Sequence, residues 1–247
     1  MGGWEYPYLV VAGYFAGLIG YITGLASIVS YPALLAIGLP PVAANVTNTV
    51  ALVGVGAGSM TNSATELRHH PRRNLVRDAV ISVVGGVLGA ILLLVSSAGS
   101  FQAVVPYLIA VASLAVVAQP SLRRLAGDRT FPIAYPAGLL AVSVYGGYFG
   151  AGAGVMLLAL VLVSTSESFW RAGILKSFLL GLSNLVAAIG FAFFGPVHWL
   201  PALVMAVGAF LGGWCGPPVV RHSNERLLRY LVAVCGLGLA IWLAGAS

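Results

Sequence analysis

The stretch ITGLASIVSYPALL, residues 22–35, interrupts a long apolar run with hydroxyl side chains and helix breakers. A helix whose only role was to lie in the lipid bilayer would consist mainly of leucine, isoleucine, valine and alanine. The residues that depart from this pattern are Thr23, Gly24, Ser27, Ser30 and Pro32. Irregular backbone at membrane depth is tolerated only where it is buried in protein or lines a wet cavity. The stretch therefore predicts a broken helix beside a polar cavity.

The composition of the whole chain is that of a membrane protein. Of its 247 residues, 60% are hydrophobic and 7% are charged, whereas a soluble domain carries about 25% charged residues. Apolar runs recur from end to end, and a run of about 18 or more such residues is typical of a membrane-spanning helix. Barrel strands would alternate polar and apolar residues over about 10 positions, which this chain does not do. We therefore expect an all-α, polytopic helix bundle embedded in the lipid bilayer of the cell membrane.

The apolar runs divide the chain into eight expected segments. They lie near residues 7–38, 41–63, 76–97, 101–119, 131–163, 168–194, 199–220 and 228–244. The first and the fifth are too long for a single crossing, because about 20 residues suffice to span the hydrocarbon core. Each of these two segments is therefore expected to contain a broken or re-entrant helix.

The two long segments also resemble each other and indicate an internal repeat. GYITGLASIVSYPALL begins at Gly20, and GYFGAGAGVMLLALVL begins at Gly147. AANVTNT at 43–49 and RAGILKS at 171–177 follow them in the same order, at a similar offset of about 125 residues. The predicted units are a first transmembrane repeat at 1–120, a basic cytoplasmic linker at 121–130 and a second transmembrane repeat at 131–247.

Basic loops suggest how the two halves are oriented. Arginines gather in the loops at 66–77, 121–130 and 221–229, and positively charged loops prefer the cytoplasm. Eight simple crossings would place the third loop opposite the first two. If each long segment instead enters and returns to the same side, all three loops are cytoplasmic and the second half is inverted. We favour the inverted arrangement over eight crossings, and we interpret the net charge of +6 as an orientation signal and not as nucleic-acid binding.

The breaks in the two halves predict a binding site for an anion. They lie at 23–32 and 150–154, and broken helices at corresponding positions are typical of a transporter's binding site. A half-helix that starts inside the membrane presents free N–H groups and the positive end of its dipole. Pro32 is expected in the first turn of such a half-helix. Close helix packing is the alternative role for the glycines of the breaks, and it is the favoured role for the glycine ridge from Gly208 to Gly216. The candidate substrate-binding residues are Thr23, Gly24, Ser27, Ser30, Asn48, Thr49, Gly150, Gly152, Gly154, Lys176 and Ser177.

Charged residues support the anion hypothesis. Lys176 is the only lysine, and burial of an ammonium at the bilayer centre costs about 3 kcal/mol. Two interpretations stay open: Lys176 attracts an anionic substrate, or it extends to lipid phosphate at the interface. The six acidic residues, Asp78 among them, are all expected in loops or at segment ends. An interior without carboxylates suits a small anion better than a cation.

Other classes of protein find less support in the sequence. An intramembrane enzyme would need a metal cluster, an acid pair or a nucleophile with its base, and the four histidines show no metal-ligand spacing. A retinal protein could use the lone lysine for a Schiff base, but it would also require a buried carboxylate counter-ion. We therefore predict no catalytic residue, no metal and no cofactor. Association between copies of the chain stays open.

The motifs also resemble those of a known family. The pattern GLASIVSYPALLAIGLPPVAANVTNTVALVG, followed later by GGYFGAGAGV, resembles the TauE/SafE family of membrane permeases, also called the sulfite exporter family. The resemblance covers nearly the whole chain and implies a duplicated multi-helix permease for small sulfur-containing anions such as sulfite, sulfonates or sulfoacetate. Members often carry Gly-Gly-Gly where this chain has Leu25, Ala26 and Ser27. They often carry a Thr-Ser pair near Lys176 and Ser177. The implied function is a secondary transporter for a sulfur oxyanion or organosulfonate.

Overall fold

A computed structural model describes residues 3–67, 70–101, 103–104, 107, 134–165 and 167–222. Every regular element in these residues is a helix, which confirms the predicted all-α class. The expected linker at 121–130, the expected segment at 228–244 and most of the segment at 101–119 lie outside the described residues.

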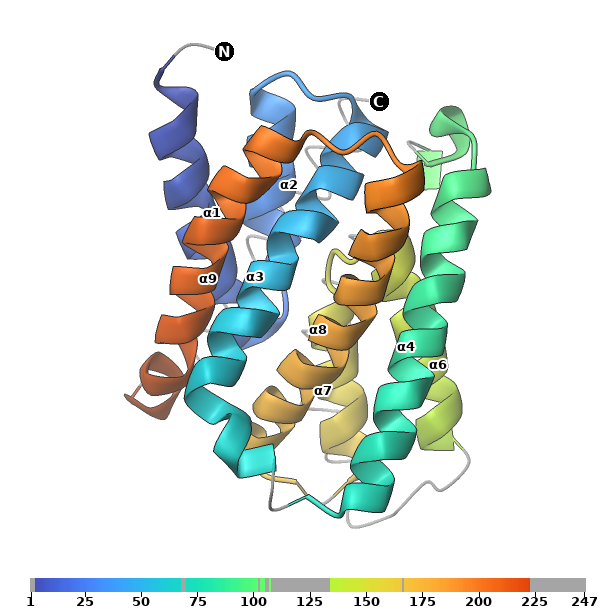
Figure 1. The fold of residues 1–247 in the computed structure, drawn as a ribbon. Coiled ribbons are helices and arrows are strands. Elements are labelled where there is room, and N and C mark those ends of the chain that lie inside the picture. The colour runs from blue at the N-terminus through green and yellow to red at the C-terminus, as the bar shows by residue number, and fades with distance from the viewer. Residues whose placement is uncertain are drawn as a thin grey trace.

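The described chain forms five long helices and three shorter ones (Figure 1). The helices are α1 (Glu5–Thr23), α2 (Ser27–Ala36), α3 (Pro41–Leu67), α4 (Arg72–Val95), α6 (Ala134–Tyr148), α7 (Ala153–Ser164), α8 (Phe169–Phe194) and α9 (Trp199–His222). The five long helices, α1, α3, α4, α8 and α9, are long and apolar enough to cross a membrane. Helices α2 and α7 are apolar but too short to do so. Each long apolar segment of the sequence is thus divided into two helices.

The first break is a glycine turn between α1 and α2. Gly24 has a φ of 86°, and its N–H donates to the carbonyl of Gly20 at 2.8 Å. A glycine in this left-handed conformation is a common way to end a helix. The prediction that Pro32 lies in the first turn of α2 is wrong, because the helix begins at Ser27 and Pro32 lies inside it. The carbonyls of Leu25 and Ala26 already accept the first bonds of α2, so the helix starts before the proline.

Each broken helix folds back on itself. Figure 1 shows α1 beginning at the upper end of the molecule and α2 returning to that end. It shows α6 beginning at the lower end and α7 returning there. The buried clusters agree, because Leu9 of α1 packs in one cluster with Leu34 of α2. Leu139 of α6 packs in another with Leu158 of α7. The two hairpins therefore enter the bundle from opposite ends.

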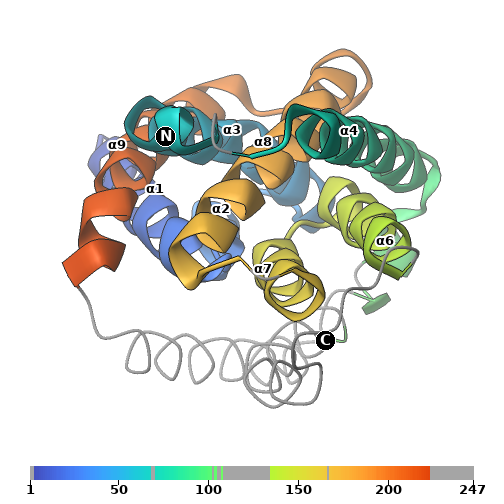
Figure 2. The same cartoon turned by 90° about the horizontal axis from the view of Figure 1, so that it is seen from below.

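Helices α3 and α8 lie between two outer pairs, α1 with α9 and α4 with α6 (Figure 2). Small residues allow the close contact of α1 with α9. A methyl group added at Gly208 would meet the backbone of Val10 and Tyr14, and one added at Gly212 would meet Tyr14 and Leu18. The predicted packing role of Gly208 and Gly212 is confirmed.

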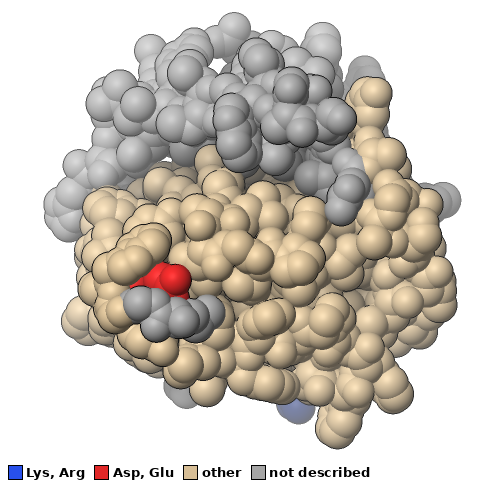
Figure 3. Space-filling view, turned by 90° about the horizontal axis from the view of Figure 1, so that it is seen from above, with Lys and Arg blue, Asp and Glu red and all other residues tan. Residues whose placement is uncertain are grey.

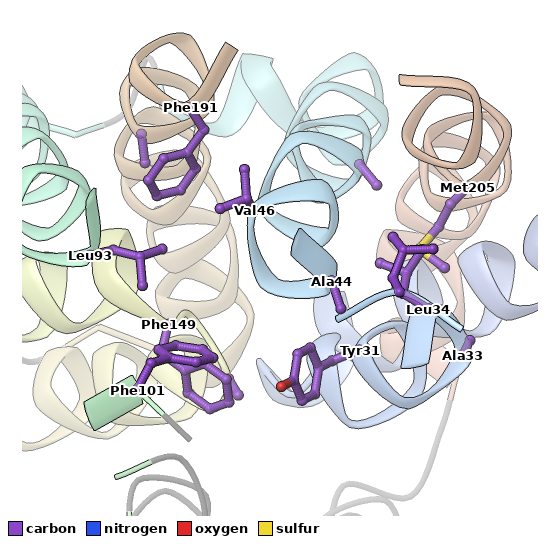
Figure 4. Packing of buried hydrophobic residues seen from close by; sticks show 14 of the residues in the cluster. Tyr31, Ala33, Leu34, Ala44, Val46, Leu93, Phe101, Phe149, Phe191 and Met205 are labelled. Carbon is purple, nitrogen blue, oxygen red and sulfur yellow. The ribbon is translucent and has the colours of Figure 1, made fainter. Parts of the chain in front are cut away.

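The two larger clusters of buried apolar side chains lie one near each end of the bundle, and a small third cluster joins Leu25 to Val155. In the upper cluster, Tyr31 and Phe101 each pack edge-on against Phe149, with ring centroids 5.7 and 5.6 Å apart (Figure 4). The lower cluster joins α7 to the first turns of α6 and α8 through residues such as Tyr135 and Leu175. Many of the buried polar side chains belong to α3 and α8, and they include Asn45, Thr47, Asn48 and Thr49 in the first third of α3 and Lys176, Ser177, Ser183 and Asn184 in α8. The two central helices of the bundle therefore carry polar side chains in its interior.

Large apolar side chains cover the outside of the bundle. Exposed examples on the long helices are Val84, Leu88, Ile91, Ile189, Phe193, Leu203, Val207 and Leu211. Such a surface is stable only when lipid tails cover it. The upper end carries few charges among the residues that the structure describes (Figure 3). Arg72 and Arg73 instead begin α4 at the lower end, where α9 also finishes (Figure 1).

One acidic residue is buried. Asp78 lies in the second turn of α4, near the segment end where the sequence predicts it, and it is 4% exposed. Arg77 approaches its carboxylate at 2.8 Å, and the hydroxyl of Tyr135 donates to it at 2.9 Å. The carboxylate is tolerated there because it has both a cation and a hydroxyl as partners. This cluster joins α4 to α6 at the lower end.

We expect Tyr135→Phe to destabilise the protein. The change removes a hydrogen bond to a buried carboxylate, and such charged bonds contribute about 1.5–3 kcal/mol. Thermal unfolding in detergent measures the loss. Tyr107→Phe is the control, because Tyr107 is 73% exposed and its hydroxyl is expected to matter little. Equal melting temperatures for both variants would contradict the prediction.

Candidate functional site

The two helix breaks touch each other inside the bundle. A methyl group added at Gly24 would overlap the backbone of Gly154 and Val155. One added at Gly154 would lie 2.5 Å from the Gly24 Cα and 2.8 Å from its carbonyl oxygen. Only glycine at both positions permits this approach, because every opposing atom is backbone. The first turn of α7 therefore lies directly against the end of α1.

The second break is a compact turn held by local bonds. Gly150 and Gly152 have φ values of 77° and 81°, and α7 begins at Ala153. The Ala153 N–H donates to the Gly150 carbonyl at 3.2 Å, and the hydroxyl of Tyr145 donates to the Ala151 carbonyl. The turn therefore ends slightly earlier than the predicted break at 150–154, because Ala153 and Gly154 are already helical.

A small pocket of about 40 Å³ lies where the breaks meet α3 and α8. A single water needs roughly 10–15 Å³ by this kind of measure, so the pocket has room for a few waters or a small ion. Its lining combines residues of both breaks with the middle of α3 and α8. The lining residues are Gly20, Gly24, Ala26, Ser27, Leu52, Val55, Gly56, Gly150, Lys176, Ser177, Leu180, Gly181 and Asn184. Five of the predicted site residues therefore share one cavity.

Lys176 is buried in this pocket, with 1% of its surface exposed. Its ammonium donates to the carbonyl of Gly20 at 3.0 Å and to that of Tyr21 at 2.5 Å. It also lies 5.4 Å from the centre of the Tyr21 ring, a cation–π distance. In this structure the lysine extends from α8 to the C-terminal end of α1, and it does not extend to the lipid interface.

Asn48 supports the pocket from α3. Its amide nitrogen donates to the Ser27 hydroxyl at 3.0 Å, and its buried amide oxygen has no hydrogen-bond partner among the described residues. Asn45, one turn earlier, donates to the carbonyl of Tyr148 beside the second break at 3.0 Å. Helix α3 thus contacts both breaks through asparagine side chains.

The remaining predicted residues do not line the pocket. The hydroxyls of Thr23, Ser30 and Thr49 donate to backbone carbonyls one turn earlier in their own stretch of helix, at 2.7, 3.1 and 3.1 Å. Such bonds occupy hydroxyls that could otherwise face a ligand. Gly152 and Gly154 shape the second turn and its contact with Gly24. These five residues act on the backbone, and their role in binding stays a prediction.

Several lining residues are not among those that the sequence predicts for the site. Gly56 of α3 and Gly181 of α8 mark the crossing of these helices, where a methyl group at Gly56 would lie 3.1 Å from the Gly181 Cα. Asn184 supplies an amide, and Gly20 supplies a carbonyl to Lys176. The offset of about 125 residues between Gly56 and Gly181, the same as that of the repeat, was the signal that could have found them.

The pocket is electrostatically suited to an anion. Its described lining holds one ammonium, two hydroxyls and an amide, and it holds no carboxylate. The first N–H groups of α2 add the positive end of a helix dipole. Within the described residues, no group of three or more histidine, cysteine or acidic side chains could hold a metal. The site can therefore hold a small negatively charged molecule by hydrogen bonds and charge.

Five spanning candidates, a lipid-compatible surface and a polar pocket between broken helices define a multi-pass membrane transporter. The chain belongs to the sulfite exporter TauE/SafE family, whose sequence model matches residues 9–243. The family prediction made from the motifs is therefore confirmed.

Relatives of the chain are probable membrane transporters. The probable membrane transporter protein ORF9 of Sinorhizobium sp. is 30% identical over 241 residues, which cover 95% of this chain and 90% of that protein. The probable membrane transporter protein YfcA of Escherichia coli K12 is 29% identical over 231 residues, covering 89% and 82%. A probable membrane transporter protein of Haemophilus influenzae is 27% identical over 234 residues, covering 92% and 89%. No solved structure matches the chain.

Proposed function

We propose that the protein is a secondary transporter for a small anion that binds in the pocket between the two helix breaks. The observation that carries the proposal is the pocket itself, in which Ser27 and Gly150 of the two breaks face Lys176 and Ser177. The family description supports a sulfur-containing substrate, a sulfur oxyanion or an organosulfonate. Such anions have several acceptor oxygens, which match the donors of the pocket.

The donors come from side chains and from backbone. The Ser27 hydroxyl, the Asn184 amide and the Lys176 ammonium line the cavity, whereas the Ser177 hydroxyl, also in the lining, donates to the Gly173 carbonyl at 2.9 Å. At the start of α2, the N–H groups of Ile28 and Val29 already bond to Leu25 and Ala26. The N–H groups of Ala26 and Ser27 are the backbone donors left for the anion. Binding by fixed donors, with charge supplied by a single lysine, suits a small oxyanion.

The proposal includes an inverted repeat of residues 1–120 and 131–247. The contacts between helices support it, because each contact in one half has a counterpart when the two halves are exchanged. The contact of α1 with α9 corresponds to that of α6 with α4, and the contact of α3 with α9 corresponds to that of α8 with α4. The two hairpins enter from opposite ends (Figure 1). The basic residues at the start of α4 and at the C-terminal end of α9 also lie at the same end of the bundle. If the variant Arg221→Cys were labelled by a membrane-impermeant thiol reagent added outside the cell, this arrangement would be contradicted.

Such a pair of halves can expose the pocket alternately to each side of the membrane. Rocking of one half against the other around a fixed site is the usual mechanism for inverted repeats. A membrane potential that is negative inside favours exit of an anion by about 2.3 kcal/mol per charge per 100 mV. Export of the anion therefore needs no further energy source.

Purified protein in proteoliposomes tests the proposed function. Vesicles loaded with labelled sulfite or methanesulfonate are given a potassium-diffusion potential of either sign. We expect the anion to leave faster when the interior is negative, and to stay in protein-free vesicles. Flux equal to that of empty vesicles for every sulfur anion tried, from protein shown to be folded, would contradict the proposal.

Removal of single hydroxyls from the pocket should weaken transport moderately. We expect Ser27→Ala to reduce flux at low anion concentration by about three- to tenfold, because it removes one hydrogen bond of about 0.5–1.5 kcal/mol. Ser177→Ala should reduce flux less, because the Ser177 hydroxyl already donates to the Gly173 carbonyl at 2.9 Å. Ser96→Ala is the control, since Ser96 bonds to the Leu92 carbonyl in an exposed position at the end of α4. If the two pocket variants transport as fast as Ser96→Ala, these hydroxyls do not contact the anion.

A further inference from the structure

We propose that the Lys176 ammonium is a tethered replacement for a coupling cation at the C-terminal end of α1. The role of this ammonium in transport rests on the proposed function, whereas its contacts with α1 do not depend on that function. In transporters with broken helices, half-helix C-terminal ends and unwound carbonyls commonly coordinate Na⁺ or a proton. Here the carbonyls of Gly20 and Tyr21, in the last turn of α1, bind the lysine Nζ at 3.0 and 2.5 Å.

The place that the ammonium occupies has the features of a cation site. It lies at the negative end of the α1 dipole, one turn before the left-handed residue Gly24. The Tyr21 ring adds its negative face at 5.4 Å. The described ion pairs do not include Lys176, so carbonyl dipoles and an aromatic ring are its recorded partners. Neutral oxygen ligands of this kind suit a monovalent cation.

The tether links substrate binding to the contact between the two halves. Lys176 belongs to α8, and its two carbonyl partners belong to α1. An ammonium has three N–H donors, and these carbonyls use two of them. The third donor can reach an anion in the pocket that Lys176 lines together with Ser27 and Gly150. One cation therefore serves both the end of α1 and the anion.

This arrangement has a direct consequence for coupling. A tethered cation stays with the protein when the anion leaves, so the anion crosses with its own charge uncompensated. Transport should then be electrogenic and independent of Na⁺. Shortening the lysine should leave the α1 carbonyls without their cation and create space for a free one.

Two substitutions test the proposal without any anion. Lys176→Ala exposes the Gly20 and Tyr21 carbonyls and leaves room beside them, whereas Lys176→Met fills most of that room with an uncharged chain. Thermal unfolding is measured in 100 mM choline, sodium or ammonium chloride. We expect Lys176→Ala alone to melt about 3–6 °C higher in sodium or ammonium than in choline, the shift for a site with a Kd near 10 mM. Wild type and Lys176→Met should melt alike in all three salts.

Each other outcome overturns the proposal. Equal melting of Lys176→Ala in the three salts would show that the carbonyls do not form a cation site. Stabilisation of wild type by sodium would show that a free cation binds beside the lysine or elsewhere. If Lys176→Ala cannot be isolated in choline, purification in ammonium chloride should recover it, and failure in all three salts also counts against the proposal. Absence of anion flux in proteoliposomes would contradict the proposed function but not the cation site at the end of α1.

Discussion

Gly24→Ala should prevent the two helix breaks from meeting and should abolish transport. The new methyl group would overlap backbone atoms of Gly154 and Val155, and neither can move aside as a side chain could. Overpacking of this kind costs about 1–3 kcal/mol and sometimes more. The φ of 86° at Gly24 adds about 1–2 kcal/mol of strain for any L-residue. We expect a large loss of thermal stability, or no folded protein in detergent.

Gly38→Ala separates the cost of backbone strain from the cost of steric overlap. Gly38 has nearly the same backbone conformation, with a φ of 89°, but a methyl group there meets nothing within 4 Å. This control should therefore lose only the strain energy and should keep its transport activity. If Gly24→Ala were no less stable than Gly38→Ala, the close contact between the breaks would not exist in the protein.

The contact between the two breaks can also be tested at Gly154, where a substitution adds no backbone strain. Gly154 is helical, and a methyl group there would lie 2.5 Å from the Gly24 Cα. Gly154→Ala should therefore behave like Gly24→Ala, although alanine favours a helix. Gly173→Ala in α8 is the matched control, because nothing lies within 4 Å of its added carbon. Fluorescence-detected size-exclusion chromatography of the four variants compares their folding directly.

Lys176→Met should nearly abolish anion transport and leave the fold close to intact. A unit charge about 4 Å from the anion contributes on the order of 4 kcal/mol at an effective dielectric of about 20, so flux at low anion concentration should fall by about a hundredfold or more. Methionine has a similar length and removes the cost of burying a charge, which offsets the two hydrogen bonds that the α1 carbonyls lose. The measurements are flux in proteoliposomes and melting temperature in detergent.

Arg171→Met provides the comparison for this experiment. Arg171 lies on the same helix, five residues earlier, and it is exposed. Its loss removes a charge of the same sign outside the pocket, so flux should change little. Flux of Lys176→Met equal to that of Arg171→Met would show that the lysine does not interact with the anion and would leave it a purely structural contact to α1.

Much of the architecture could be predicted from residues alone. Apolar content and run length indicated membrane helices, because transfer of apolar side chains into lipid depends mainly on local sequence. Glycine and proline near residues 24 and 32 indicated a break, although the proline lies one turn later in the helix than expected. The family pattern across 9–243 was also readable without coordinates. Asp78, in contrast, is buried because Tyr135 and Arg77 bind it, and these contacts could not be inferred from its place in the sequence.

The candidate pocket was predicted less completely than the fold. Ser27, Gly24, Gly150, Lys176 and Ser177 do share one cavity. The hydroxyls of Thr23, Ser30 and Thr49, and that of Ser177 in the cavity itself, bond to backbone one turn earlier, because a serine or threonine in a helix can reach that carbonyl. Residue type shows that a hydroxyl is present, and the packing of the surrounding helices determines whether it faces a cavity.

Chain composition and helix breakers were thus enough to establish a membrane bundle with two interrupted helices, since both depend on the transfer energies and backbone preferences of single residues. The partners of the polar groups depended on tertiary structure. Lys176 reaches a carbonyl 155 residues away in the sequence, and Gly24 touches the first turn of α7. Such contacts arise only when the bundle brings the two hairpins together, because a buried ammonium is stable only where a neighbouring helix, here the last turn of α1, supplies its oxygen ligands.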